Sequence, residues 1–330
     1  MAQHVQDSTL SDAVLAHLPK AELHLHLDGA VAPALLARFA QRHGAPPPTL
    51  ATDDHSYGSF PDLAAFLAVY GQVCRFMRAP VDFEEASFAA LARCAAGGAR
   101  HVELFFSPDA HDPAAISYGA MLDGLTAGLS RAEAEFGLTC LLIPAHNREL
   151  GPERGMEFLD RVLADRRPQV VGIGLDYAER GNPPELFAAM FERARREGLR
   201  VTAHAGEDGP AAHVRDSIAQ LGCRRIDHGY HVVDDPGLVA ACREQDILFT
   251  VCPSTTLHTT IWRDLAAPDH AIRRMIEAGL RVTVATDDPA MFGTNLLCEY
   301  RLLAHTMGLD QATILAIAAN GLSHSWRSDD

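Results

Sequence analysis

Eight short apolar runs, rich in β-branched residues, constrain the fold of this 330-residue chain more than any other feature. Each run is followed by a polar turn and then by a segment with helical periodicity. The runs are AELHLHL (21–27), HVELFFS (101–107), TCLLIPA (139–145), VVGIGLD (170–176), RVTAHAG (200–206), RIDHG (225–229), ILFTVC (247–252) and RVTVATD (281–287). Strands that alternate with helices are typical of a parallel sheet, and eight such repeats predict a (β/α)8 TIM barrel, an α/β fold.

The interval between the first and second runs is too long for one crossover helix. It contains three helix-like segments, at 36–44, 60–77 and 83–98. We therefore expect extra helices inserted after the first strand, lying over the barrel mouth. An open doubly wound sheet is the alternative, but the run GIGLDY (172–177) lacks the third glycine of a G-x-G-x-x-G fingerprint. No linker-like segment divides the chain, so we treat residues 1–330 as one domain.

Composition and charge restrict the class of partner. The chain is 48% hydrophobic and 22% charged, as in soluble globular proteins. Its net charge of −15 disfavours nucleic acid, whose backbone is bound by clustered Lys and Arg. We find no secretory signal, no apolar stretch of the roughly 18 residues that a membrane helix needs, and seven dispersed cysteines without a C-x-x-C pair. These features indicate a cytoplasmic protein whose partner is a small molecule.

Polar residues gather at the carboxyl ends of four predicted strands, and these ends converge on one face of a barrel, where active sites are found. His24 and His26 are two apart in the first strand, so their side chains face the same side. The others are His204 and Glu207 on the fifth strand, His228 on the sixth, and Asp287 and Asp288 on the eighth. Each has a structural explanation alone, but the joint placement predicts a site.

The residue types at these ends narrow the chemistry. Three histidines and one carboxylate, His24, His26, His204 and Asp287, suit Zn²⁺ or another divalent metal with a position left for water. Such a metal lowers the pKa of water from 15.7 to about 7, which predicts a hydrolase. Glu207 is then placed to protonate the substrate, and His228 to orient the water or accept its proton.

Four of these segments carry a family resemblance. ELHLHLDGA (22–30), HAGED (204–208), RIDHG (225–229) and TDDPAMFG (286–293) resemble the signature segments of the adenosine deaminase family of metal-dependent amidohydrolases. They occur in the family order and spacing from about residue 20 to residue 320.

The resemblance implies hydrolytic replacement of a purine 6-amino group by oxygen, with release of ammonia. It implies that His24, His26, His204 and Asp287 hold zinc. Glu207 would protonate purine N1, His228 would assist the attacking hydroxide, and Asp288 would bond near N7.

The segments point to different substrates within the family. Asp28 resembles the residue that accepts a ribose 5′-hydroxyl in members acting on adenosine, whereas members acting on adenine typically have Glu there. Yet GLDYAERGNPP (174–184) resembles the adenine branch, and Tyr177 stands where the adenosine branch has glycine. CPSTTLHTT (252–260) departs from both branches, because Thr255 and Thr256 replace the usual Ser-Asn.

We favour an adenosine-type nucleoside because Asp28 offers a definite ribose partner. The alternatives are adenine, an N6-substituted adenine, and a 5′-modified adenosine such as aminodeoxyfutalosine. Two other readings are a different amidohydrolase reaction and a metal-binding barrel without catalysis. We expect Arg148, Phe60 and Phe66 to have structural roles, with pocket lining as the alternative.

Overall fold

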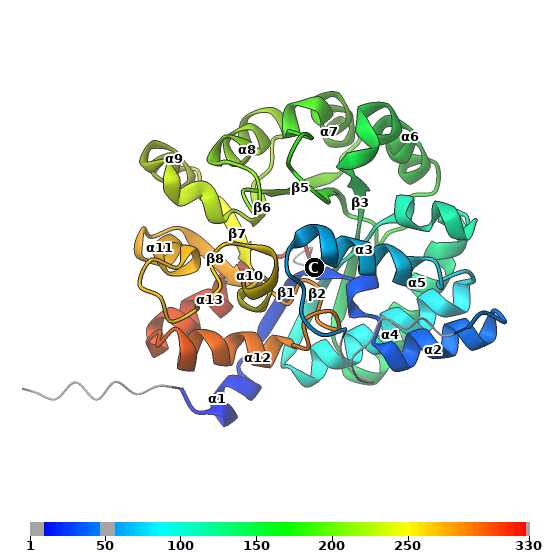
Figure 1. Cartoon of the computed structure of the whole chain (residues 1–330), viewed down its shortest axis with the longest axis horizontal. Helices are drawn as coiled ribbons and strands as arrows, with labels where there is room; N and C mark the ends of the chain where they lie inside the picture. Colours follow the sequence, from blue (N-terminus) through cyan, green and yellow to red (C-terminus); the bar gives the residue numbers. More distant parts are fainter. Residues whose placement is uncertain (1–9, 47–56, 328–330) are drawn as a thin grey trace, which may run out of the picture.

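The eight predicted strands form one parallel sheet in chain order, as the computed structural model of residues 10–46 and 57–327 shows (Figure 1). The strands are β1 (Lys20–His26), β2 (Ala99–Phe106), β3 (Thr139–Asn147), β4 (Gly172–Asp176), β5 (Arg200–Ala205), β6 (Arg225–His228), β7 (Leu248–Val251) and β8 (Arg281–Val284). The sheet closes where the backbone N–H of His26 donates to the carbonyl of Asp287 at 2.8 Å and the N–H of Asp287 donates to the carbonyl of His24 at 2.9 Å. The TIM barrel prediction is confirmed.

Helices surround the strands, because each βαβ crossover returns the chain along the outside of the sheet (Figure 1). The α-helices outside the insertion are α1 (Asp12–His17), α5 (Tyr118–Phe136), α6 (Gly151–Ala164), α7 (Ala188–Arg196), α8 (Ala211–Asp216), α9 (Pro236–Glu244), α10 (Pro253–Thr259), α11 (Ala271–Glu277), α12 (Leu296–Arg301) and α13 (Gln311–Ser323). Short 3-10 turns are η1 (Asp28–Ala30), η2 (Pro108–Ala114), η3 (Arg148–Leu150), η4 (Pro184–Phe187) and η6 (Tyr230–Asp234), and π turns are η5 (Ser217–Leu221) and η7 (Leu302–Thr306). In the described ranges, no helix combines the length and apolar character of a membrane span.

The insertion after β1 folds into α2 (Pro33–Arg42), α3 (Leu63–Cys74) and α4 (Pro80–Ala96). Asp62 caps the start of helix α3, because its side chain accepts from the N–H of Ala65 at 2.8 Å. The helix lies over the barrel mouth as predicted. Helix α4 instead packs along α5 in the outer ring. A Cβ atom on Gly124 would lie only 2.0 Å from the Pro80 carbonyl oxygen, so glycine permits this close contact.

A buried ion pair lies toward the end of the barrel where the strands begin. Arg225 donates to Glu103 at 2.6 Å, and its guanidinium lies 3.9 Å from the ring centroid of Trp326. The Trp326 ring also packs against β4, because a Cβ atom on Gly172 would lie 2.5 Å from it. The C-terminal segment therefore covers this end, and the mouth under α3 is the end available for chemistry.

Candidate active site

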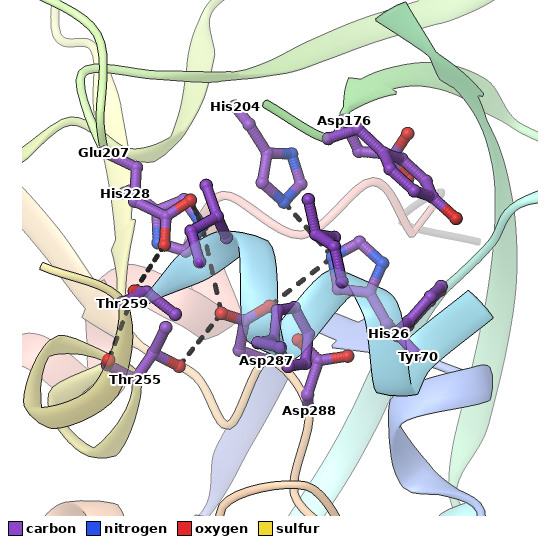
Figure 2. Close-up of a pocket in the computed structure, with 14 residues that line it drawn as sticks. His26, Tyr70, Asp176, His204, Glu207, His228, Thr255, Thr259, Asp287 and Asp288 are labelled. Carbon is purple, nitrogen blue, oxygen red and sulfur yellow. Dashed lines mark hydrogen bonds and ion pairs between the residues drawn. The ribbon is translucent and has the colours of Figure 1, made fainter. Parts of the chain in front are cut away.

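A cavity of about 410 Å³, counted with its open mouth, lies at the carboxyl ends of the strands beneath α3 (Figure 2). Its lining residues are His26, Leu63, Phe66, Leu67, Tyr70, Asp176, Tyr177, His204, Glu207, His228, Thr255, Thr259, Asp287 and Asp288. Apolar and aromatic side chains of α3 face polar groups on the strand ends. This pairing of an apolar wall with a few convergent polar groups is typical of a small-molecule site.

The four predicted metal ligands converge beside this cavity. The Nε2 atoms of His24, His26 and His204 lie 3.0–3.2 Å from one another. Asp287 Oδ1 lies 3.2 Å from the Nε2 atom of His24 and 3.5 Å from that of His26. Ligands held tetrahedrally at about 2.0–2.1 Å from an ion lie about 3.3 Å apart. The buried set therefore fits one divalent cation.

Backbone geometry helps to aim side chains at the strand ends. Tyr177 after β4, His228 at the end of β6 and Asp287 after β8 all have left-handed backbone, with φ values of 67°, 68° and 60°. Non-glycine residues in this region each cost about 1–3 kcal/mol. All three residues line the cavity, so this strained backbone lies at the candidate site.

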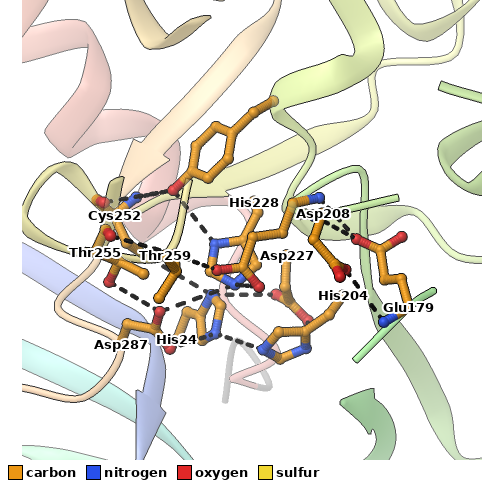
Figure 3. A network of polar contacts seen from close by, with 12 residues as sticks. His24, Glu179, His204, Asp208, Asp227, His228, Cys252, Thr255, Thr259 and Asp287 are labelled. Atoms are coloured by element: carbon orange, nitrogen blue, oxygen red, sulfur yellow. Dashed lines mark hydrogen bonds and ion pairs between the residues drawn. The ribbon is translucent and has the colours of Figure 1, made fainter. Parts of the chain in front are cut away.

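His24 is oriented through Thr250 by Asp227, which the sequence analysis did not single out (Figure 3). Its carboxylate accepts from Thr250 Oγ1 at 2.9 Å and from Thr202 Oγ1 at 2.7 Å. Because the Thr250 hydroxyl donates to Asp227, its oxygen is left to accept from Nδ1 of His24, 3.0 Å away. That tautomer leaves the Nε2 lone pair of His24 facing the other ligands, as metal coordination requires.

Glu207 and His228 lie next to the metal set. Nε2 of His228 is 3.6 Å from Oε2 of Glu207 and 3.9 Å from Oδ2 of Asp287. Burial, with a further contribution from the charge of Asp287, raises the pKa of Glu207 to about 8. Burial lowers the pKa of His228 to about 4. Near neutral pH the pair therefore offers a protonated carboxyl and a neutral imidazole, which suit a proton donor and a proton acceptor.

Helix α10 supports both carboxyl groups of the site. Thr259 donates to Oε1 of Glu207 at 2.7 Å, and Thr255 donates to Oδ2 of Asp287 at 2.9 Å. Thr256 turns away from the cavity and donates to the Pro253 carbonyl at 2.7 Å. Of the two threonines that replace Ser-Asn, Thr255 therefore lies at the site, and Thr256 stabilises the start of α10.

The loop that carries Glu207 is held by Glu179. The Glu179 carboxylate accepts from the backbone N–H groups of residues 206, 207, 208 and 209 at 2.8–3.2 Å, and it lies 2.9 Å from Nδ1 of His213. Burial alone would raise the pKa of Glu179, but the His213 and backbone hydrogen bonds lower it to about 2. Glu179 is therefore ionised and fixes the backbone of the Glu207 loop.

Asp288 and Tyr177 line the cavity, as predicted for substrate-binding residues. Burial, increased by the neighbouring Asp287 charge, raises the pKa of Asp288 well above its ordinary range, so its carboxyl carries a proton. A Cβ atom on Gly29 would lie 1.7 Å from Oδ1 of Asp288. Residue 29 must therefore be glycine for Asp288 to keep this position.

Asp28 lies outside the cavity lining, in contrast to our expectation of a ribose contact. It is fully buried, with Oδ1 2.9 Å from Nε2 of His111 and Oδ2 accepting from the Tyr70 hydroxyl at 3.1 Å. Burial alone would raise the pKa of Asp28, but the adjacent His111 lowers it.

We expected structural roles for Arg148, Phe60 and Phe66, with pocket lining as the alternative. Of the three, Phe66 lines the cavity. Arg148 is fully buried, donates to the carbonyl of His204 at 3.1 Å and does not line the cavity. Phe60 also stands outside the lining, whereas Phe66 belongs to it.

The cavity contains residues that the sequence analysis missed. Asp176 is the last residue of its apolar run, so the strand-end rule applied to the other strands would have identified it. Tyr70 and Thr259 carry no comparable signal, because they lie on helices whose approach to the strand ends is a tertiary property.

Comparison with known proteins gives matches over almost the whole chain. The family model described as adenosine deaminase matches residues 19–330. An adenine deaminase of Sphingopyxis alaskensis is 37% identical over 96% of this chain and 92% of the relative, and one of Rhodospirillum rubrum is 36% identical over 96% and 94%. The crystal structure of an adenine deaminase from Arthrobacter aurescens is 35% identical and superposes with a TM-score of 0.87 over 94% of each chain. An amidohydrolase from Burkholderia ambifaria with bound zinc is 33% identical, with a TM-score of 0.91 over 99% of this chain and 91% of that one.

Proposed function

The chain belongs to the adenosine deaminase family of hydrolytic deaminases, and from this premise we propose that its substrate is the free base adenine, with zinc as the metal. The reaction is adenine plus water giving the 6-oxopurine plus ammonia. The relatives described as adenine deaminases support the free base over the nucleoside that Asp28 suggested. The zinc in the Burkholderia ambifaria amidohydrolase supports the metal.

The placement of Asp28 carries the choice between base and nucleoside. Both of its carboxylate oxygens already face protein partners, Tyr70 and His111, and it lies behind the cavity wall. A ribose hydroxyl would have to displace Tyr70 to reach it, leaving a buried hydroxyl without its partner, which costs about 1–3 kcal/mol. Asp28 therefore positions Tyr70, and we assign it no contact with a ribose.

The wall that Tyr70 forms suits a flat base. The rings of Tyr70 and Tyr177 meet edge to face with centroids 6.0 Å apart, and Phe66 packs against Tyr70 at 5.8 Å. These aromatic faces offer apolar contact to a purine, whose polar edges then meet the carboxyl groups of the strand ends.

Each polar residue of the cavity has a role in this reaction. His24, His26, His204 and Asp287 would hold the divalent cation, which would supply the Lewis acidity that lowers the pKa of water to about 7. Glu207 donates its proton to purine N1, so that C6 becomes electrophilic. His228 orients the attacking water through its neutral ring and accepts its proton, and protonated Asp288 donates to N7. The C6–N6 bond then breaks as His228 passes the water proton to N6, which leaves as ammonia, and the remaining proton on O6 returns to Glu207, giving the 6-oxopurine.

A substrate panel tests this proposal. Purified protein loaded with zinc is given adenine, adenosine, 2′-deoxyadenosine, N6-methyladenine and a 5′-modified adenosine, and ammonia and the 6-oxopurine are measured. We expect adenine to have the highest kcat/KM, with ammonia and product formed in equal amounts. A higher kcat/KM for any nucleoside would restore the ribose contact and overturn the choice of the free base.

Metal removal provides a second test. Treatment with a chelator should abolish turnover, and zinc added back should restore it, because a water near neutral pH is otherwise a poor nucleophile. Full activity in protein that elemental analysis shows to be free of metal would contradict the proposed metal role.

A further inference from the structure

Asp176 is a buried carboxyl group of the cavity to which the reaction above assigns no role. It ends β4, is only 3% exposed and lines the cavity. Its Oδ2 atom accepts from Ser107 Oγ at 2.9 Å, but Oδ1 has no hydrogen-bond partner within residues 10–46 and 57–327. A buried polar atom without a partner is costly, so it is expected where a ligand supplies the partner.

Nearby charges do not neutralise Asp176. The charge of Arg148 lowers the pKa of Asp176, but that side chain donates to the His204 carbonyl and lies 3.9 Å from Glu179. Burial, increased by the charges of Asp109 and Asp28, raises the pKa of Asp176 to about 8. Because Ser107 donates to Oδ2, the carboxyl proton resides on Oδ1, the atom without a partner.

The purine edge left free by the proposed reaction has matching chemistry. Glu207 meets N1, Asp288 meets N7, and C6 faces the metal ligands, so the edge opposite C6 remains. That edge presents N3, an acceptor, and N9–H, a donor, when N9 carries no substituent. Figure 2 shows Asp176 on the side of the site away from Glu207, Thr255 and Thr259, where this edge would lie.

We propose that Asp176 binds the N3/N9–H edge of the free base, with Oδ1–H donating to N3 and Oδ2 accepting from N9–H. This inference rests on the proposed adenine deaminase function and adds the residue that selects for it. A sugar on N9 removes the donor and places bulk against the Asp176 carboxyl group. Asp176 is thus a specificity-determining residue for 6-aminopurines with an unsubstituted N9.

The test uses two analogues, each lacking half of the contact. 9-Methyladenine has no N9–H, and 3-deazaadenine has no N3. With the zinc-loaded enzyme, adenine should exceed each analogue in kcat/KM by about tenfold or more, since a site built to bond a donor or acceptor rejects the analogue lacking it. In Asp176→Ala, kcat/KM for adenine should fall about tenfold to a hundredfold, and both ratios should approach one.

Asp176→Asn is the matched variant. Its amide oxygen can keep the Ser107 bond while its NH₂ group donates to N3, so the preference for adenine over both analogues should largely remain. Asp269→Asn, which changes an exposed carboxyl outside the cavity lining, should leave every ratio unchanged. Ratios in Asp176→Ala equal to those of the wild type, or a loss of preference in Asp176→Asn as large as in Asp176→Ala, would overturn the proposal.

A binding measurement separates this inference from the proposed function. Calorimetric titration with hypoxanthine, which keeps N3 and N9–H, should give a Kd about tenfold or more weaker for Asp176→Ala, with zinc content unchanged. If the wild type fails to deaminate adenine, the proposed function falls. If it deaminates adenine while Asp176→Ala keeps both the ratios and the Kd, only the role of Asp176 falls.

Discussion

The two ends of this barrel both bury carboxyl groups, but the partners of these carboxyl groups differ. Where the strands begin, Glu103 meets Arg225 at 2.6 Å and Nε2 of His101 at 3.3 Å. At the mouth, neither Asp176 nor Glu207 pairs with a Lys or Arg among the described residues, and their hydrogen bonds come from the hydroxyls of Ser107 and Thr259.

The difference appears directly in the pKa values. Burial alone would raise the pKa of Glu103, but the Arg225 charge outweighs it and lowers that pKa. At the mouth burial dominates, and the pKa values of Asp176 and Glu207 both rise to about 8. Loss of one partner from a buried ion pair is strongly destabilising, whereas a buried carboxyl without a charged partner remains available to a ligand. Of the three carboxyl groups compared, the two that line the cavity are the two without a charged partner.

The largest expected effect is at the mouth. Glu207→Gln should lower kcat by about a hundredfold to ten-thousandfold, because the amide cannot protonate the purine. Zinc content and the free energy of unfolding should change little, since an already neutral carboxyl is replaced. Loss of zinc, or a loss of stability larger than the loss of activity, would contradict the role of Glu207 as a proton donor.

A Glu-to-Gln substitution at the end where the strands begin should lower stability and leave activity almost unchanged. Glu103→Gln leaves the buried Arg225 unpaired and should destabilise the protein by about 3–5 kcal/mol, measured by urea unfolding. The kcat/KM for adenine should remain close to that of the wild type under conditions where the variant is folded. A large loss of kcat at full occupancy of the folded state would show that this end takes part in catalysis.

Glu179 gives a test that depends on pH. Its folded pKa is about 2 against an ordinary value of 4.5, so its stabilising effect is complete above about pH 4.5 and disappears as the pH falls toward 2. The shift corresponds to about 3 kcal/mol. Acid unfolding of the wild type should therefore be steeper in this range than that of Glu179→Gln. Parallel curves for the two proteins would mean that Glu179 is not held as a carboxylate.

The smallest expected effect concerns the orientation of Glu207. Thr259→Val removes one hydrogen bond to its carboxyl group and should lower kcat by about threefold to tenfold. Thr259→Ser should restore most of the activity, because it keeps the hydroxyl. Thr260→Val, which removes a bond to the Thr256 carbonyl outside the cavity lining, is the matched control, and an equal loss there would make the effect structural.

The sequence alone was sufficient for the barrel and for the grouping of the four candidate metal ligands. The alternation of apolar runs with helical segments is a local pattern, and parallel strands in a barrel must end on one face. His24 and His26 face one side because residues two apart in a strand do so, and the strand-end rule brings His204 and Asp287 to them. These inferences need no knowledge of which side chains meet across the mouth.

Only the tertiary structure decided what surrounds the substrate. Asp28 follows His26 by two residues, yet its partners are His111, 83 positions away, and Tyr70, which the inserted helix α3 brings to the barrel. The partnerless oxygen of Asp176 is likewise a property of the assembled cavity. Strand alternation determines the face toward which a side chain points, whereas its hydrogen-bond partners and burial depend on segments distant in sequence that only folding brings together.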